Sequence, residues 1–247
     1  MINKLSSFVF KLVSRYFLTN FYTTLHITEC FTSIQGEGVR QGTPSHFIRL
    51  HGCSIKCPWC DSKYSWTEYT MYTYHTIVEL FNNFKYSHPN VTNLVITGGE
   101  PLEQDIRSLV ILGKALGWTV EIETNGLLDS FHHSNKTFFK FIDLFVVSPK
   151  LLTSSHITKY TQQGFRQFPC YKTIFKFVAE SESDVDKIVS FCNESSIDKS
   201  KVWIMPKGIT RDDIAKTSAE LVSICLCYNL KLSDRFHIMI WGTKRGV

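Results

Sequence analysis

Short apolar runs that alternate with stretches of helical periodicity constrain the fold of this chain more than any other feature. The runs predicted to be strands are 25–31, 46–50, 93–97, 118–123, 142–147, 173–178, 201–205 and 236–241. Several of them are apolar almost throughout, which is typical of strands that are buried on both faces. The helices expected between them are 74–86, 103–116, 181–195 and 211–228. This alternation predicts an α/β fold built on a parallel sheet, either open or closed into a barrel.

The chain is predicted to hold one domain, residues 25–247, preceded by an N-terminal extension, residues 1–24. The extension contains Lys4, Lys11 and Arg15 and no acidic residue. This composition is typical of an organelle-targeting segment, and equally of a simple extension or a misassigned start. Its charges interrupt the apolar residues, so we expect no membrane-spanning helix. Segment 150–172 has neither helical nor strand periodicity and is interpreted as an irregular insertion.

The charge and the cysteine content of the chain argue against a nucleic-acid-binding protein and indicate a metal centre. Three units of the net charge of +5 lie in the extension, so we expect no nucleic-acid partner for the domain. The chain has eight cysteines, three of which are clustered. In a chain of this length without a clear secretory signal, clustered thiols indicate a metal centre more often than disulfides. We therefore expect a reducing compartment such as the cytoplasm.

Polar or reactive residues follow four successive predicted strands where each strand ends. These segments are Gly52–Ser62, Thr97–Pro101, Glu123–Gly126 and Ser148–Lys150. In α/β barrels the active site forms at the C-terminal ends of the strands. We therefore expect the four segments to converge on one site.

The first of these segments carries Cys53, Cys57 and Cys60 in ten residues. Three thiolates could hold a four-iron cluster and leave one iron without a protein ligand. A zinc site would need a fourth donor, for which His51 is cramped, and a Cys57–Cys60 redox pair would leave Cys53 unexplained. The spacing alone favours the cluster and leaves the two alternatives open.

Single residues near these segments have both structural and functional interpretations. Glu100 is explained most simply by a tight turn, whereas Glu123 lies in an apolar strand and needs a partner. Arg49 lies in a strand that looks buried, so it requires either a structural or a ligand carboxylate. Gln35 and Glu37 could pair with a polar heterocycle, or could belong to a surface loop.

Two features near the C-terminus have simpler interpretations. His237 lies in a predicted strand and is expected to be a packed side chain. Residues 244–247 are expected to form a solvated basic tail.

Cys-x3-Cys-x2-Cys followed by Gly-Gly-Glu-Pro resembles the radical S-adenosylmethionine (SAM) superfamily. More specifically, IQGEG, FIRLHGC, CPWCDS, ITGGEP, ETNG and VSPK, in this order, resemble the 7-carboxy-7-deazaguanine synthase family. The resemblance extends over residues 25–247, with no clear match in 150–172. It implies an incomplete TIM-like (β/α) barrel, and the helical segments are too few for eight full units.

The resemblance also implies a reaction. A [4Fe–4S] cluster chelates SAM through its open iron, and one electron yields a 5′-deoxyadenosyl radical. This radical removes hydrogen from C6 of 6-carboxy-5,6,7,8-tetrahydropterin. The ring then contracts with loss of ammonia to give 7-carboxy-7-deazaguanine, an early step towards queuosine. The family regenerates SAM, uses Mg2+ on the substrate carboxylate, takes its electron from a flavodoxin-like or ferredoxin-like donor, and forms homodimers.

Carried over residue by residue, the resemblance assigns four sets of site residues. The cluster ligands are Cys53, Cys57 and Cys60, and the Mg2+ ligand is Ser62. The SAM-binding residues are Trp59, Cys60, Asp61, Gly99, Glu123, Ser148, Pro149 and Lys150, with Met205 and Pro206 as weaker candidates. The pterin-binding residues are Ile34, Gln35, Gly36, Arg49, Thr97 and the C-terminal Val247.

Two other functions compete with this interpretation. The first is another radical SAM enzyme, such as a glycyl-radical activating enzyme, although Arg49 and Ser62 suit a small carboxylated heterocycle better. The second is a zinc-stabilised binding protein. Iron content after anaerobic reconstitution distinguishes the second from both radical enzymes.

Overall fold

The computed structural model describes residues 24–127, 135–151, 165 and 167–247. The predicted extension 1–24 therefore lies outside the described residues except for residue 24. Most of the predicted insertion 150–172 lies outside them as well.

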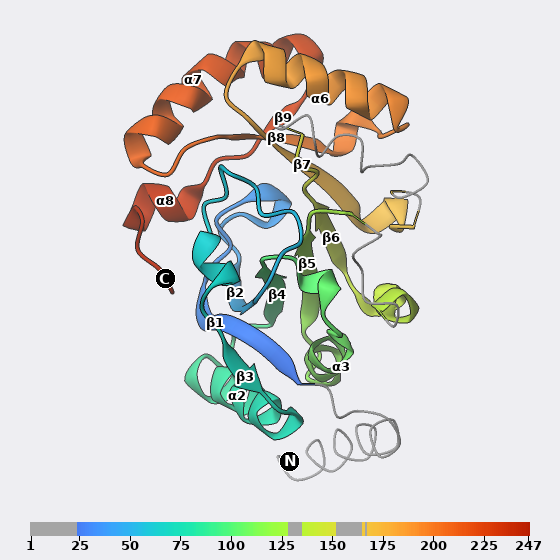
Figure 1. Cartoon of the computed structure of the whole chain (residues 1–247), viewed down its shortest axis with the longest axis vertical. Coiled ribbons are helices and arrows are strands. Elements are labelled where there is room, and N and C mark those ends of the chain that lie inside the picture. The colour runs from blue at the N-terminus through green and yellow to red at the C-terminus, as the bar shows by residue number, and fades with distance from the viewer. Residues whose placement is uncertain (1–23, 128–134, 152–164, 166) are drawn as a thin grey trace.

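One curved, open sheet of nine strands forms the centre of the molecule (Figure 1). Its strands are β1 (Leu25–Ile34), β2 (Pro44–Leu50), β3 (Thr70–Tyr72), β4 (Asn93–Gly98), β5 (Thr119–Thr124), β6 (Leu144–Val147), β7 (Thr173–Ala179), β8 (Val202–Pro206) and β9 (Lys231–Leu232). The order across the sheet is β3-β1-β2-β4-β5-β6-β7-β8-β9. The pairs from β2 to β9 are parallel, whereas β1 is antiparallel to both β2 and β3. The prediction of an α/β fold with an incomplete barrel is confirmed, and the antiparallel first strands modify the expectation of a parallel sheet.

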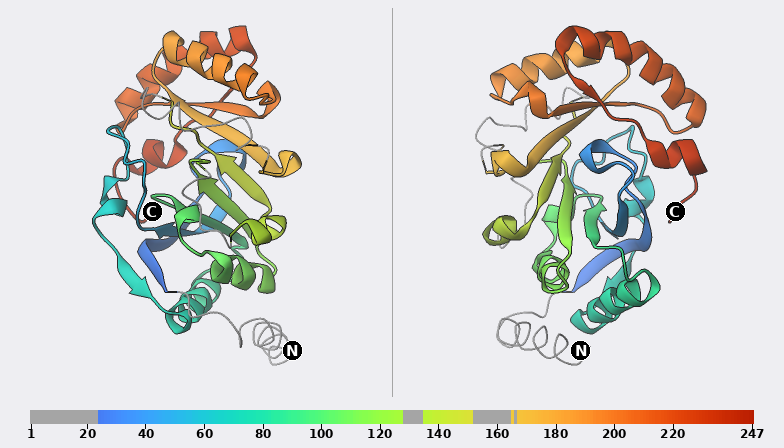
Figure 2. Two further views of the ribbon diagram at one scale, coloured as in Figure 1. Left: turned by 45° about the vertical axis from the view of Figure 1, so that its right-hand side comes forward. Right: turned by 180° about the vertical axis from the view of Figure 1, so that it is seen from behind.

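The α-helices are α2 (Tyr74–Ser87), α3 (Arg107–Ala115), α6 (Glu182–Glu194), α7 (Arg211–Tyr228) and α8 (Phe236–Trp241). The helices α2, α3, α6 and α7 lie along the outer side of the curved sheet, whereas α8 lies beside the loop after β1 (Figure 2). Short 3-10 turns are η1 (Gly38–Arg40), η2 (Lys63–Trp66), η3 (Pro101–Glu103), η5 (Asn135–Phe141), η6 (Cys170–Lys172) and η7 (Lys199–Lys201). No helix in the described part of the chain is long and apolar enough to cross a membrane.

The starts of the helices follow from local side chains. Ser181 accepts a hydrogen bond from Asp184 N at the start of α6, and Thr210 forms a reciprocal capping box with Asp213 at the start of α7. The predicted helix 103–116 begins later, at Arg107, because Pro101–Glu103 first forms the separate turn η3.

The prediction of a strand at 236–241 is wrong, because this segment is helix α8. The edge of the sheet beside β8 is already occupied by β9. The chain then turns away, and Phe236 N donates to Gly36 O (2.8 Å) instead of joining a strand ladder. A short apolar run does not distinguish a strand from a helix by its periodicity, and here the neighbouring loop decides.

Parallel strands bring their C-terminal ends to the same edge of the sheet. The segments that follow β2, β4, β5 and β6 therefore meet there, on the inner side of the curve. The backbone joins two of them directly, because Gly99 N donates to Leu50 O (2.9 Å) and Glu100 N donates to Gly52 O (2.7 Å). The prediction that these strand ends converge is confirmed.

His46 in β2 is a fully buried titratable side chain. It stacks on Phe84 (centroids 4.5 Å apart) and Trp118 (4.7 Å), and its Nδ1 lies 2.8 Å from Thr32 Oγ1. Burial disfavours the imidazolium form and lowers the pKa of His46 from 6.5 to about 4.

We expect the domain to lose stability through His46 as the pH falls from about 6.5 to 4. In this range the unfolded chain binds a proton at His46 that the folded chain does not, so unfolding becomes easier by up to about 3 kcal/mol. Burial raises the pKa of Glu100 and Glu121 to about 7, which acts in the opposite sense. The measurement therefore compares two proteins. Urea unfolding gives the free energy of unfolding of the wild type and of His46→Gln between pH 7 and 4, and the difference between the two curves isolates the contribution of His46. Parallel pH curves for the two proteins would contradict this assignment.

Candidate active site

A cavity of about 1040 Å3 lies at the C-terminal ends of the strands. Its lining includes every residue that the sequence predicted for the site except Pro149. The predicted set therefore surrounds one space, with the cysteine loop on one side and the segment after β1 on the other.

The cysteine loop, Gly52–Ser62, folds around a small apolar cluster of its own. Ile55 and Cys57 are buried against Leu127, and Cys53 packs beside them. Lys56 adopts a left-handed backbone conformation (φ 49°), which turns the loop between the first two cysteines. Burial raises the pKa of the Cys57 thiol to about 11, with a further contribution from the neighbouring Cys53 and Cys60. The three sulfur atoms therefore occupy one shared environment.

The three thiols of this loop fit a [4Fe–4S] cluster in their number and in their place on one short loop. Among the described residues, no group of three His, Cys, Asp or Glu side chains is arranged to hold a single metal ion. A [4Fe–4S] cluster attaches each thiolate to a different iron and requires wider spacing. All eight cysteines are free thiols.

The neighbouring wall offers unused hydrogen-bond donors. Trp59 Nε1 and Asn125 Nδ2 are buried, and within the described residues neither has a hydrogen-bond partner. Lys150 lies over the Trp59 ring (5.8 Å) and donates to Ser148 Oγ (2.8 Å). Buried donors without a partner are rare in folded proteins, so they mark a place for a polar ligand. This set fits the carboxylate, ribose and adenine groups of SAM.

Ser62 is the single protein donor that the sequence predicted for Mg2+. Its hydroxyl lies 3.6 Å from Cys60 Sγ and faces the cavity. One hydroxyl does not hold Mg2+ alone, but this ion keeps several waters and takes further oxygens from its substrate. The site fits an ion that arrives together with a carboxylated ligand.

Glu100 is structural, as its position in a turn suggested. It is fully buried and accepts hydrogen bonds from Leu102 N (3.0 Å), Thr124 Oγ1 (2.7 Å) and Asn125 N (2.7 Å). The carboxylate thus ties the end of β4 to the end of β5. These hydrogen bonds all come from the scaffold, so Glu100 holds two walls of the cavity together.

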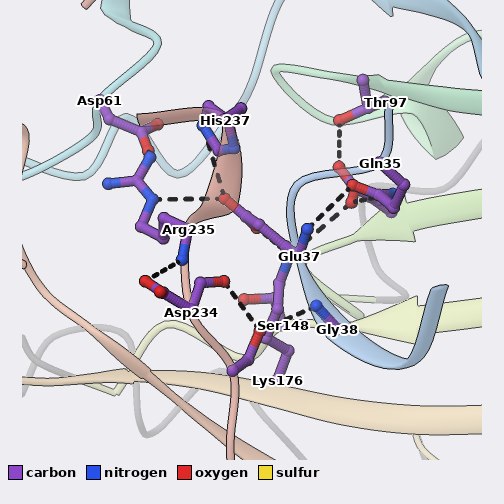
Figure 3. A network of polar contacts seen from close by, with 12 residues as sticks. Gln35, Glu37, Gly38, Asp61, Thr97, Ser148, Lys176, Asp234, Arg235 and His237 are labelled. Atoms are coloured by element: carbon purple, nitrogen blue, oxygen red, sulfur yellow. Dashed lines mark hydrogen bonds and ion pairs between the residues drawn. The ribbon is translucent and has the colours of Figure 1, made fainter. Parts of the chain in front are cut away.

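Glu37 is the centre of a buried ion network on the opposite side of the cavity (Figure 3). Lys176 from β7 pairs with Glu37 Oε2, and Arg235 Nε donates to Glu37 Oε1 (3.3 Å). Although burial raises the pKa of Glu37, the two cations outweigh it and hold the pKa well below its usual range. The carboxylate is therefore ionised.

The sequence analysis missed Lys176 and Arg235. Lys176 lies between two phenylalanines of β7, and no role was predicted for it. The one signal in the sequence was a lysine within a largely apolar strand. If such a lysine is buried, it needs an anionic partner. Arg235 is nearly fully buried. Nothing in the sequence indicated a role for it except its position directly before an apolar run.

Glu123 occupies the centre of the cavity wall. Its Oε2 accepts from Thr97 Oγ1 (2.8 Å), and its Oε1 accepts from Gln35 Nε2 (3.3 Å) and lies 3.7 Å from Lys176 Nζ. Thr97 and Gln35 were predicted for the pterin and Glu123 for SAM. Their direct bonds place Glu123 where the two predicted ligand regions meet.

Glu121 lies beneath this wall. It accepts from Gln35 Nε2 (2.9 Å), and burial next to Glu123 raises its pKa to about 7. Gln35 is therefore a buried bridge between two carboxylates, which excludes the alternative of a surface loop.

Arg49 has a structural carboxylate as its partner. Its Nε donates to Glu29 Oε1 (2.8 Å), which also accepts from Tyr64 OH (2.8 Å). Arg245 stacks over Tyr64 (3.6 Å) and lies 3.6 Å from Glu29 Oε2. Residues 244–246 of the tail are exposed, as expected, whereas Val247 at its end is half-buried and lines the cavity.

His237 is also not a packed strand residue. It lies on α8, lines the cavity, and places Nε2 4.0 Å from Glu37 Oε1. A Cβ at Gly36 would overlap the His237 ring. Glycine at position 36 thus allows α8 to approach the loop after β1.

The chain resembles known proteins over most of its length. The family model of the Radical SAM superfamily matches residues 47–219. The chain is 31% identical over 225 residues to the 7-carboxy-7-deazaguanine synthase of Pyrobaculum aerophilum, covering 90% of this chain and 97% of that protein. It is 32% identical over 225 residues to that of Clostridium acetobutylicum, covering 90% and 98%. The crystal structure of QueE from Escherichia coli superposes with a TM-score of 0.67 at 23% identity, covering 87% of this chain and 95% of that one, which shows a shared fold.

We expect Gly99→Ala to destabilise the junction between the cysteine loop and β4. A Cβ at this position would overlap Gly52 O and press on Cys53 Cβ. Relief requires the two strand ends to separate, which we expect to lower the free energy of unfolding by about 2 kcal/mol or more. Urea unfolding measures this loss. Gly117→Ala is the control, because it adds a Cβ in open space and costs about 1 kcal/mol of backbone strain. Equal losses in the two variants would show that the Gly99 contact is unimportant.

Proposed function

Since the chain belongs to the Radical SAM superfamily and, within it, to the 7-carboxy-7-deazaguanine synthase family, we propose that it is a radical SAM lyase acting on a pterin. Its substrate is 6-carboxy-5,6,7,8-tetrahydropterin. The product is 7-carboxy-7-deazaguanine, formed with loss of ammonia on the way to queuosine and related deazapurines.

One observation carries this proposal: a single cavity joins the three-thiol loop to a wall of buried carboxylates and amides. Radical chemistry requires the hydrogen donor to lie close to the cofactor, and it requires water to be excluded. A pterin has several N–H and C=O groups along one edge. Gln35, Thr97 and Glu123 offer acceptors and donors for such an edge, whereas a protein glycine would not use them.

The cysteine side of the cavity fits the cofactors. Cys53, Cys57 and Cys60 would hold a [4Fe–4S] cluster, and Trp59, Asn125, Ser148 and Lys150 would bind SAM. When bound, these cofactors supply the one-electron chemistry that removes hydrogen from C6 of the pterin. The protein residues bind, orient and shield the reactants.

Charged residues on the other side would bind the carboxylated substrate. Glu29 accepts from Arg49 Nε and thereby fixes the plane of the guanidinium at the cavity. Ser62 would supply one oxygen to Mg2+ bound by the substrate carboxylate. Arg245 holds the tail against Tyr64, and Val247 lines the cavity, where it would contact the substrate.

The partners follow from the same family membership. We infer that a flavodoxin-like or ferredoxin-like protein supplies the electron, that the protein works as a homodimer, and that it does so in a reducing compartment such as the cytoplasm. The eight free thiols support the last inference.

The direct test is anaerobic reconstitution with iron and sulfide, followed by incubation with SAM, Mg2+, a reductant and 6-carboxy-5,6,7,8-tetrahydropterin. We expect broad brown absorbance and formation of 7-carboxy-7-deazaguanine with one ammonia per product. One zinc per chain and no iron would instead support a zinc-stabilised binding protein. Iron incorporation and SAM cleavage without turnover of the pterin would support another radical SAM enzyme.

We expect Cys60→Ala to lose the cluster and all product formation, because two remaining thiolates hold a four-iron cluster poorly. Iron content and absorbance at about 400 nm measure cluster assembly. Cys170→Ser is the matched control, because Cys170 is an exposed free thiol outside the cavity. Full activity in Cys60→Ala would remove the basis for the proposed cluster.

We expect Arg49→Ala to weaken pterin binding while cluster assembly stays intact. The variant loses the cation that meets the substrate carboxylate and also leaves Glu29 without one of its partners, so KM should rise about 100-fold or more. Arg49→Lys retains the positive charge but not the two-pronged geometry of the guanidinium. Its KM should lie between those of the wild type and Arg49→Ala. An unchanged KM in Arg49→Ala would exclude Arg49 as a substrate ligand.

A further inference from the structure

Arg235 connects three segments that are far apart in the sequence, and none of the site assignments above uses it. Its Nε donates to Glu37 (3.3 Å), and one terminal nitrogen donates to Asp61 (Figure 3). The other terminal nitrogen donates to the carbonyl of Gly208. The side chain is 7% exposed. The guanidinium thus bonds through all three of its nitrogens to carboxylate or carbonyl oxygens.

These partners belong to different sides of the cavity. Asp61 directly follows Cys60 and precedes Ser62, so it lies on the loop proposed to hold the cofactors. Glu37 follows Gln35 and Gly36, on the wall proposed to hold the pterin, where Lys176 also binds it. Arg235 is therefore the direct ionic link between the two sides.

The chemistry of this link suits exact placement more than stability. Burying a guanidinium is costly, and a buried ion pair is weak evidence for net stabilisation compared with apolar packing. Asp61 keeps 42% of its side chain exposed, so it does not need Arg235 to satisfy a fully buried charge. A planar fork with fixed donor directions, however, restricts the distance and angle between the groups it joins.

We propose that Arg235 is a positioning residue that holds the cysteine loop at a fixed distance from the substrate wall, so that the radical source and the pterin meet in a reactive geometry. The inference rests on the proposed function. Transfer of a hydrogen atom between two bound molecules depends steeply on their separation, and a displacement of about 1 Å can cost about 100-fold in rate. Misplacement would also allow SAM to be cleaved without reaction of the substrate.

The experiment compares Arg235→Met, Arg235→Lys and the wild type after reconstitution. Arg107→Met is the control, because it removes an Arg–carboxylate pair with Asp105 that lies outside the cavity. Four quantities are measured: iron content, the Kd of SAM, the Kd of the pterin, and the ratio of 5′-deoxyadenosine released to 7-carboxy-7-deazaguanine formed.

In Arg235→Met we expect wild-type iron content, each Kd within about 5-fold of wild type, and a ratio of released 5′-deoxyadenosine to product that rises about 10-fold or more. Arg235→Lys keeps the charge without the fork and should give an intermediate ratio. Arg107→Met should keep the wild-type ratio.

A slower Arg235→Met enzyme with an unchanged ratio would overturn the inference, because a merely structural residue lowers SAM cleavage and product formation together. If Arg235→Met fails to fold or to take up iron, the test uses Arg235→Lys instead. A raised ratio of released 5′-deoxyadenosine to product in that variant supports the inference, and a wild-type ratio overturns it. Failure of the proposed function is distinguishable, since it would appear in the wild type as absence of product, whereas failure of this inference appears in the variants alone.

Discussion

The cavity depends on one interaction above all, the burial of Glu37 between Lys176 and Arg235. It joins the loop after β1 to strand β7 and to the segment before α8, which are separated by 139 and 198 residues. The two cations keep Glu37 ionised. Each charge of the network has at least two partners, because Lys176 also lies 3.7 Å from Glu123 Oε1 and Arg235 also donates to Asp61. The network therefore joins three segments that are remote in the sequence.

The two sides of the cavity are built by different means. The cysteine side relies on backbone bonds and close approach, where Gly99 lies against Gly52 and Glu100 ties two strand ends together. The substrate side relies on buried side-chain charges, where Glu123 and Gln35 meet the Lys176 network. The first provides a rigid support for an inorganic group. The second provides a polar surface that matches a heterocycle, and Arg235 links the two.

Contiguous motifs could be predicted from the sequence, and spatial pairings could not. Cys53, Cys57 and Cys60 share one loop, and parallel strands bring successive strand ends to one edge, so their convergence followed from strand order alone. Lys176 and Arg235 acquire their role from partners that are remote in the sequence, which periodicity does not reveal. The run at 236–241 was assigned to a strand because five apolar residues in six are too short a run to distinguish a strand from a helix. In the structure its first residue, Phe236, donates to Gly36 O and begins a helix. His237 was misjudged for the same reason, since it lies on α8 and lines the cavity.

The central claim is that one cavity brings SAM and the C6 position of the pterin into contact. Substrate deuterated at C6 tests this most directly, with SAM recovered after turnover by the reconstituted protein and analysed by mass spectrometry. Because hydrogen moves from C6 to the adenosyl group and SAM is regenerated, we expect deuterium at the 5′ carbon of the recovered SAM. Product formation without deuterium in SAM or in 5′-deoxyadenosine would contradict the claim.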